Sequence, residues 1–283
     1  MTRIIAIAIL AIGRLAVAQP LQYETRHVTR TVPGCGDAKG GCAHVELNYI
    51  EVASGPPLAR GRINSAILAY LVDGGKLTPQ EYVNDSIKDF LTVSPGHQGY
   101  LLKNVTMLRA TPPLFSVECS LESFELGGQP HPYFETRYLN FDAATGNPVT
   151  LSSFLKDGSM ARLTAIAETH FRKERKLGAT GDLEGFTFPH NRFELNETYG
   201  FGEDRLVFFF NRYEIAAYVM GATRIEIPYD EIRDLLRPGL GTAPMAPAGA
   251  GVPGAAASEQ IRIKPLLDDL AGETDDPSLS PDV

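Results

Sequence analysis

The sequence lacks the short motifs that usually mark a catalytic site. It contains no Gly-x-Ser-x-Gly elbow, no Walker loop and no His-Glu-x-x-His helix. Its six histidines are scattered, and no two of them have a spacing typical of metal ligands. The sequence therefore predicts a protein that is not an enzyme and holds no cofactor or metal. The alternative is a hydrolase that uses paired carboxylates, for which Glu46 with Glu51, or Glu118 with Glu122, are the candidates.

Cysteine is scarce, with three residues in the chain. Cys35 and Cys42 lie near the two ends of a Gly-rich loop between two strand-like segments, so in an oxidising compartment they are expected to form a disulfide. A zinc site is the alternative, but two thiols and the neighbouring His44 fall short of four ligands. Cys119 lies on the apolar face of an alternating segment, which predicts a buried and unreactive thiol.

The chain also lacks an excess of positive charge. It has 26 lysines and arginines against 34 aspartates and glutamates, a formal net charge of −8. Nucleic-acid binding needs a basic surface, so this class of partner is not expected. An acidic surface attracts cationic partners at long range, although solubility alone also explains it.

No hydrophobic run is long enough for a membrane-spanning helix. The first residues combine Arg3, an apolar stretch over residues 4–13 and the small-residue pattern Ala16-Val17-Ala18. The stretch is much shorter than the ~20 residues that a transmembrane helix requires. These features predict a signal peptide over residues 1–18, export to the periplasm or the extracellular space, and no transmembrane anchor.

The other end of the chain has the composition of a linker and a tail. Residues 241–257 are rich in proline, glycine and alanine and show no hydrophobic period. Residues 258–283 are acidic and poor in aromatic side chains. Residues 241–283 are therefore expected to form a flexible linker and a disordered acidic tail.

The part between these ends predicts an α+β fold, with an antiparallel sheet packed by helices. Apolar residues repeat every three to four positions from Ile63 to Leu71, and Thr78-Pro79-Gln80-Glu81 is a capping box that opens a second helix. Strand-like segments lie on both sides of these helices. They are residues 21–32, 43–52, 101–110, 114–126 and 133–141.

The following segment predicts a second group of helices and strands. A short helical turn is expected at residues 150–155, and a longer helix after Ser159, which is expected to cap it. Two strands over residues 192–199 and 205–210 are expected to form a hairpin. Residues 222–227 then alternate strictly, and Pro228 ends that strand and can open a helix.

Three of these segments resemble the C-terminal half of the PdaC/RsiV-like domain. They are residues 146–171, 192–221 and 223–236, and residues 27–142 are more loosely similar to the N-terminal half. The order of an apolar strand, Tyr-Glu-Ile, glycine, and Ile-Pro-Tyr before a helix is the specific part. The resemblance implies two interlocked halves, residues 19–145 and 146–240.

The resemblance also implies a function. The PdaC/RsiV-like domain is a bacterial extracytoplasmic module that is found in a peptidoglycan deacetylase and in a lysozyme-sensing anti-sigma factor. Deacetylation belongs to a separate catalytic domain with an Asp pair and a His-x-x-x-His motif, which this sequence lacks. The resemblance therefore implies a non-catalytic module that binds peptidoglycan or a lysozyme-like muramidase. A cell-envelope hydrolase is the alternative.

The loop over residues 211–221 is the predicted ligand surface. It interrupts a strand-like apolar run with polar and aromatic residues, and amphipathic rings suit contacts with sugars or with another protein. Tyr213, Glu214, Tyr218 and Tyr229 are the candidate residues. The alternative is that the tyrosines pack between the two halves.

Overall fold

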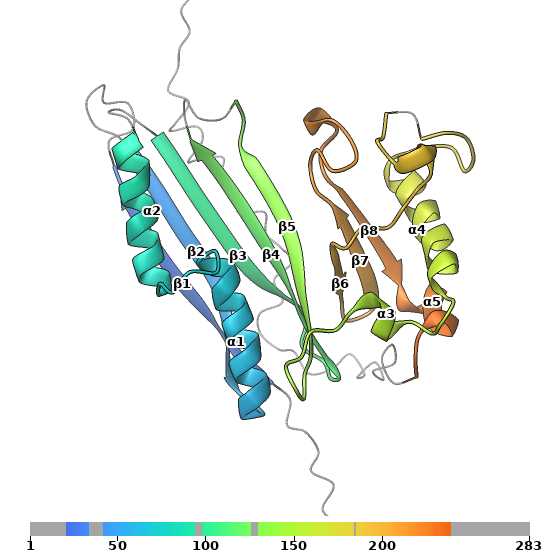
Figure 1. Cartoon of the computed structure of the whole chain (residues 1–283), viewed down its shortest axis with the longest axis horizontal. Coiled ribbons are helices and arrows are strands. Elements are labelled where there is room, and N and C mark those ends of the chain that lie inside the picture. Colours follow the sequence, from blue (N-terminus) through green and yellow to red (C-terminus); the bar gives the residue numbers. More distant parts are fainter. Residues whose placement is uncertain (1–20, 34–41, 94–97, 126–129, 184, 239–283) are drawn as a thin grey trace, which may run out of the picture.

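The computed structural model describes residues 21–33, 42–93, 98–125, 130–183 and 185–238, and it contains two β-sheets flanked by helices (Figure 1). The first part comprises β1 (Gln22–Val32), β2 (Cys42–Ser54), α1 (Pro57–Leu71), α2 (Pro79–Val93), β3 (Gln98–Arg109), β4 (Leu114–Glu125) and β5 (Tyr133–Asp142). The second comprises α3 (Leu151–Phe154), α4 (Met160–Glu174), β6 (Tyr199–Phe201), β7 (Arg205–Phe210), β8 (Thr223–Pro228) and α5 (Tyr229–Ile232), with single 3₁₀ turns at Pro189–Asn191, Tyr218–Met220 and Arg233–Leu235. The predicted α+β class is confirmed. The expected signal peptide over residues 1–18 and the expected linker and tail over residues 241–283 lie outside the described residues.

The larger sheet has the strand order β1-β2-β3-β4-β5 and is mixed rather than antiparallel throughout. The pair β2–β3 is parallel, whereas the other three pairs are antiparallel. This corrects the expectation of a purely antiparallel sheet. The reason is the connection: α1 and α2 both lie between β2 and β3, and a long helical crossover returns the chain in the same direction.

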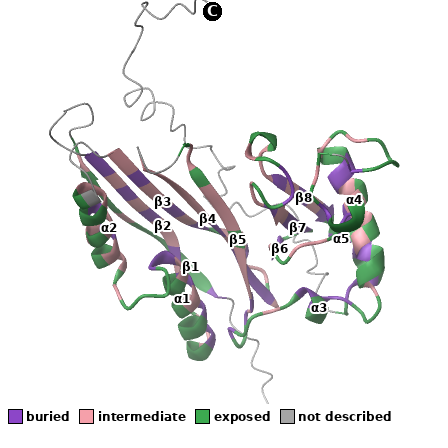
Figure 2. Ribbon diagram, turned by 45° about the horizontal axis from the view of Figure 1, so that its top comes forward, coloured by how far each residue is buried: buried purple, intermediate pink, exposed green. Residues whose placement is uncertain are grey.

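The hydrophobic core of the larger sheet lies under α1 and α2. Buried and partly exposed residues alternate from Ala43 to Asn48 in β2, as expected for a sheet with one covered face (Figure 2). The covered face meets the apolar stripe of α1, where Ile63 and Ile67 are buried. The capping box is confirmed at α2, because the Thr78 N–H donates to Glu81 Oε2 (2.8 Å) and the Glu81 N–H donates to Thr78 Oγ1 (3.3 Å).

Cys119 belongs to this core, as its position on an apolar face predicts. Its side chain is free and fully buried in β4, and burial raises the pKa of the thiol to about 12. Cys42 opens β2, while Cys35 lies outside the described residues, so their disulfide stays a prediction.

Because the thiolate is the reactive species, we expect a thiol reagent to leave Cys119 unmodified in the folded protein. After denaturation without reductant, the same reagent is expected to modify one cysteine in each chain, as read by intact mass. Rapid labelling of the native protein would contradict the burial of Cys119.

The smaller sheet has the order β6-β7-β8, is antiparallel throughout, and packs against α4. The alternation predicted for β8 is confirmed, since Thr223, Ile225 and Ile227 are buried while the residues between them are partly exposed.

The hairpin expected from residues 192–199 and 205–210 is shorter than predicted. Residues 192–198 are not a strand, because Asn196 contacts β7 through its side-chain amide, which donates to Phe209 O (2.7 Å). The Ser159 side chain makes no capping hydrogen bond.

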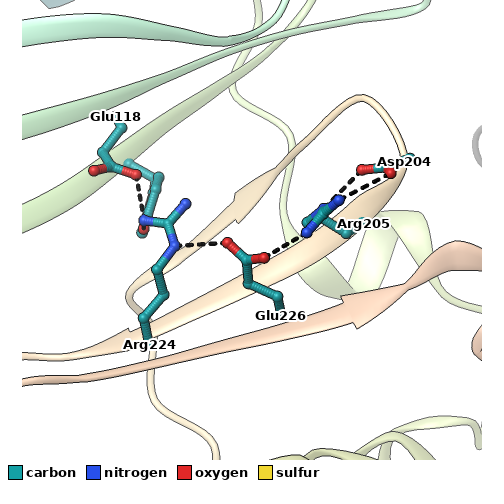
Figure 3. A network of polar contacts seen from close by, with 6 residues as sticks. Glu118, Asp204, Arg205, Arg224 and Glu226 are labelled. Atoms are coloured by element: carbon teal, nitrogen blue, oxygen red, sulfur yellow. Dashed lines mark hydrogen bonds and ion pairs between the residues drawn. The ribbon is translucent and has the colours of Figure 1, made fainter. Parts of the chain in front are cut away.

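The smaller sheet packs on part of the larger one through close backbone and ionic contacts. Gly200 fits between two side chains of the larger sheet, and a Cβ there would lie 2.5 Å from atoms of both Leu108 and Tyr138. Arg224 of β8 donates to Glu118 of β4 (2.6 Å), and the alternating charges continue through Glu226, Arg205 and Asp204 (Figure 3). The two sheets are therefore joined by specific polar groups.

Candidate binding pocket

The loop between β7 and β8, residues 211–221, is held firmly against β5. The Asn211 side chain donates to Thr136 O (2.9 Å) and accepts from the Thr136 N–H (2.7 Å), as an added strand residue would. The Asn211 N–H donates to Glu214 Oε2 (2.7 Å), and Asn196 donates to Glu214 Oε1 (2.6 Å). Glu214 thus closes the loop, and both of its carboxylate oxygens already accept hydrogen bonds.

The loop carries two tyrosines that meet a histidine from the chain before β5. The His131 ring stacks on Tyr218, with 3.7 Å between ring centroids and an interplanar angle of 19°. His131 Nε2 lies 3.0 Å from Tyr213 Oη, and the two tyrosine rings are 5.5 Å apart. The three rings form a continuous aromatic cluster in which each ring contacts both of the others.

Arg212 holds this cluster to the larger sheet. Its guanidinium lies 4.0 Å from the centre of the Phe134 ring and 4.7 Å from that of Tyr218, both within cation–π range. Arg212 Nη1 donates to Tyr218 Oη (2.7 Å), which in turn donates to Pro132 O (2.9 Å). The position of the Tyr218 ring is therefore set by polar contacts at its hydroxyl and by stacking on its face.

These residues enclose a concave pocket of about 110 Å³. Its lining consists of Pro130, His131, Pro132, Tyr133, Phe134, Arg212, Tyr213 and Tyr218. Tyr213 is 63% exposed and Tyr133 is 46% exposed, so two ring faces remain open to solvent at the rim. Tyr213 also has a left-handed backbone (φ 67°), which is uncommon for a residue other than glycine. The loop holds this exposed ring in place at some conformational cost.

The structure brings together two of the four predicted surface residues. Tyr213 and Tyr218 lie in the pocket, whereas Glu214 stabilises the loop beside it. Tyr229 is wrongly predicted: it is 5% exposed, its hydroxyl donates to Gly202 O (3.1 Å), and its ring packs against Phe154. Burial raises the pKa of Tyr229 well above its ordinary value. It belongs to the core of the smaller sheet, because α5 turns its first residue inward.

Sequence analysis missed the residues that complete the pocket, namely His131, Tyr133, Phe134 and Arg212. The histidine had no neighbour at ligand spacing, and its partners lie more than 80 positions later in the chain. Two adjacent aromatic residues, Tyr133 and Phe134, begin β5 and were the available signal. The sequence of a strand does not show which of its faces a later loop covers.

The carboxylates considered for hydrolysis have other partners. Glu46 contacts His44 (3.2 Å) and Glu51 pairs with Arg26 (2.8 Å). Glu118 pairs with Arg224, and Glu122 accepts from Tyr100 (2.8 Å).

Among the described residues, no group of three or more histidine, cysteine, aspartate or glutamate side chains is placed to hold a metal ion. In the same part of the chain, no helix combines the length and apolar character needed to span a bilayer.

Comparison with known proteins places the fold. A crystal structure of a member of the DUF3298 family from Bacteroides fragilis is similar with a TM-score of 0.62 and 18% identity, covering 77% of this chain and 94% of that chain. A DUF3298 family protein from Pseudomonas aeruginosa has a TM-score of 0.57 and 18% identity, covering 80% and 99%. No curated protein matches the sequence. Residues 152–230, from α3 to the start of α5 and including the loop of the pocket, match the family described as "Protein of unknown function (DUF3298)".

Proposed function

We propose that this chain is an exported, non-catalytic binding module that recognises cell-wall glycan through the aromatic pocket. The observation that carries the proposal is the pocket itself: rings from residues 131–134 and from the loop over residues 211–221 converge on one concave site. A fixed set of amphipathic rings provides apolar contact at low entropic cost, with polar groups at the edges.

The chemistry of the pocket suits a sugar ring. The apolar face of a sugar can stack on Tyr213 or Tyr133, while His131 and the tyrosine hydroxyls offer donors and acceptors to its hydroxyl groups. The volume of about 110 Å³ is below the range of roughly 300–1,000 Å³ typical of small-molecule sites. The pocket therefore suits one ring of a longer ligand.

Two further features support the proposal. The resemblance to the PdaC/RsiV-like domain implies an extracytoplasmic module that recognises the cell wall, and the first 18 residues have the pattern of a signal peptide. The alternative of a cell-envelope hydrolase gains no support from this pocket, whose lining residues include no carboxylate to act as an acid or a nucleophile.

A lysozyme-like muramidase is the second candidate ligand. The observation that favours it is the net charge of −8, because an acidic protein attracts a cationic enzyme at long range. Such binding is expected to weaken strongly with salt, whereas stacking of a neutral sugar is not.

Substituting Tyr213 is expected to separate binding from stability. Because its ring is largely exposed, Tyr213→Ala is expected to leave the melting temperature nearly unchanged and to weaken binding by at least ~1 kcal/mol. The measurement is a pull-down with purified peptidoglycan and, separately, with a cationic lysozyme, each at low and high salt.

Tyr23→Ala is the matched control, since Tyr23 is a partly exposed tyrosine on β1 that does not line the pocket. Unchanged peptidoglycan binding by Tyr213→Ala would contradict the proposed site. Salt-sensitive binding to lysozyme alone would instead favour the second candidate.

A further inference from the structure

Among the described residues, the smaller sheet covers one part of the face of the larger sheet opposite α1 and α2 and leaves another part uncovered. On the covered part, Glu118 and Tyr138 face each other across β4 and β5, and Arg224 of the smaller sheet contacts both. Toward the other end of the same strands, three rows of facing residues cross the sheet on the same side. These rows are Thr31-His44-Tyr100-Phe124, Thr29-Glu46-Leu102-Glu122-Phe134 and His27-Asn48-Asn104-Ser120-Thr136.

The polar side chains of these rows are linked to one another. Asn48 donates to Glu46 Oε1 (2.5 Å) and to Asn104 Oδ1 (3.0 Å), and its own Oδ1 lies 2.6 Å from His27 Nδ1. His44 lies between Thr31 (2.7 Å) and Glu46 (3.2 Å). These contacts fix the direction of the polar groups. A preorganised set of this kind loses little entropy when it binds a ligand.

These groups remain accessible to solvent. The side chain of His27 is 52% exposed, that of Glu46 is 25% exposed and that of His44 is 19% exposed. Asn48 and Asn104 are also partly exposed. Glu46, Asn48 and Asn104 have further donor or acceptor capacity, because an amide or a carboxylate can make more hydrogen bonds than the network uses.

The charge of the rows selects the class of ligand. None of the three rows contains a lysine or an arginine, while Glu46 and Glu122 each contribute a carboxylate. An anionic polymer would meet these carboxylates and would find no lysine or arginine within the three rows. A neutral polymer with many hydroxyl groups instead finds acceptors, donors and, at one margin, the partly exposed ring of Phe124.

The rows lead into the aromatic pocket. Glu122 of the middle row faces Phe134, which lines the pocket, and Thr136 at the end of the third row is bonded to Asn211 of the loop. The middle row crosses five strands, a span of about 19 Å at the usual strand spacing. This length exceeds one sugar ring and corresponds to several rings in a chain.

We propose that the three rows form a second subsite, which binds an extended, uncharged glycan chain whose end or inner ring occupies the aromatic pocket. This inference rests on the proposed function and deepens it, because it assigns a ligand of several rings rather than a single sugar. The pocket supplies stacking, and the sheet face supplies hydrogen bonds along the chain.

The test is a series of binding measurements with β-1,4-linked N-acetylglucosamine di-, tetra- and hexasaccharides. For the unmodified protein, affinity is expected to rise at least about tenfold from the disaccharide to the hexasaccharide. The double variant Asn48→Ala/Asn104→Ala is expected to bind the disaccharide normally and to lose most of that gain. Asn84→Ala on α2 is the matched control, since Asn84 is a surface asparagine on the helical side that contacts Arg30.

Melting curves of the double variant establish that it folds, and Glu46→Gln provides a milder change on the same face that should reduce the gain in part. Two outcomes would overturn the second subsite while leaving the pocket intact. The first is that the unmodified protein binds all three oligosaccharides with the same affinity. The second is that the folded double variant keeps the full rise in affinity from the disaccharide to the hexasaccharide. If Tyr213→Ala leaves disaccharide binding unchanged but the face variants still abolish the gain, the pocket is wrong and the sheet face stands. Absence of binding to every oligosaccharide would overturn both.

Discussion

Replacing Phe171 with alanine is expected to destabilise the smaller sheet by about 3–5 kcal/mol, as for other large-to-small changes of a buried aromatic residue. The Phe171 ring is fully buried on the inner side of α4. It contacts four other rings at centroid distances of 4.9 to 6.2 Å, those of Phe186, Phe188, Phe193 and Phe210. Its removal leaves a cavity that these rings cannot fill without leaving their own contacts.

The effect of Phe171→Ala is expected to be local, because the two sheets have separate hydrophobic cores. Hydrogen exchange should show reduced protection in β7 and β8 and nearly normal protection in β2 and β3. Met160→Ala on the same helix is the control; Met160 is 42% exposed, so a change within about 0.5 kcal/mol is expected. An equal loss of protection in both sheets would show instead that they unfold as one unit.

Much of the fold follows from local sequence patterns. The apolar stripe around Ile63 predicts α1, the Thr78 capping box marks the start of α2, and the strict alternation before Pro228 predicts β8. In each case the signal lies within one element, because the periodicity of a helix or strand is repeated in consecutive residues. The buried state of Cys119 follows from the same reasoning.

The site depends on contacts that no local pattern contains. The pocket combines residues 130–134 with residues 212–218, and only tertiary packing brings His131 beside Tyr213. The three rows on the open sheet face likewise depend on strand register. Asn48 and Asn104 become neighbours because β2 pairs in parallel with β3, which the antiparallel expectation did not include, and His27 joins them through the antiparallel pair β1–β2.

Tyr229 shows how a local pattern can mislead. Its position after Ile-Pro, at the first turn of a helix, is equally compatible with an exposed and a buried ring. The deciding contacts come from Gly202 and Phe154, which are distant in sequence. An aromatic residue at a helix start therefore needs a tertiary partner before its role can be assigned.

Substituting Arg224 with methionine is expected to weaken the joint between the two sheets. Arg224 donates to Glu118 Oε2 (2.6 Å), Glu226 Oε1 (2.8 Å) and Tyr138 Oη (3.1 Å), so its loss removes one donor from each of these partly buried groups (Figure 3). A loss of stability on the order of 1–3 kcal/mol at neutral pH is expected for such a change. Arg233→Met is the control, because its ion pair with Asp230 is highly exposed and should contribute little.

The pH dependence of stability tests a second contact of Arg224, its hydrogen bond to Glu226 on the same strand. Burial raises the pKa of Glu226, but hydrogen bonds from Arg224 and Arg205 outweigh it and hold the pKa below its ordinary value of 4.5. A carboxyl group with a lowered pKa contributes stability that is fully present above pH 4.5 and is lost as the pH falls through the folded-state pKa.

Stability measured by denaturant unfolding between neutral and acidic pH should therefore fall less steeply below pH 4.5 for Arg224→Met than for the unmodified protein. Because Arg205 still contacts Glu226, part of the dependence should remain in the variant. A variant with the full acid dependence would show that Arg224 does not stabilise the ionised form of Glu226.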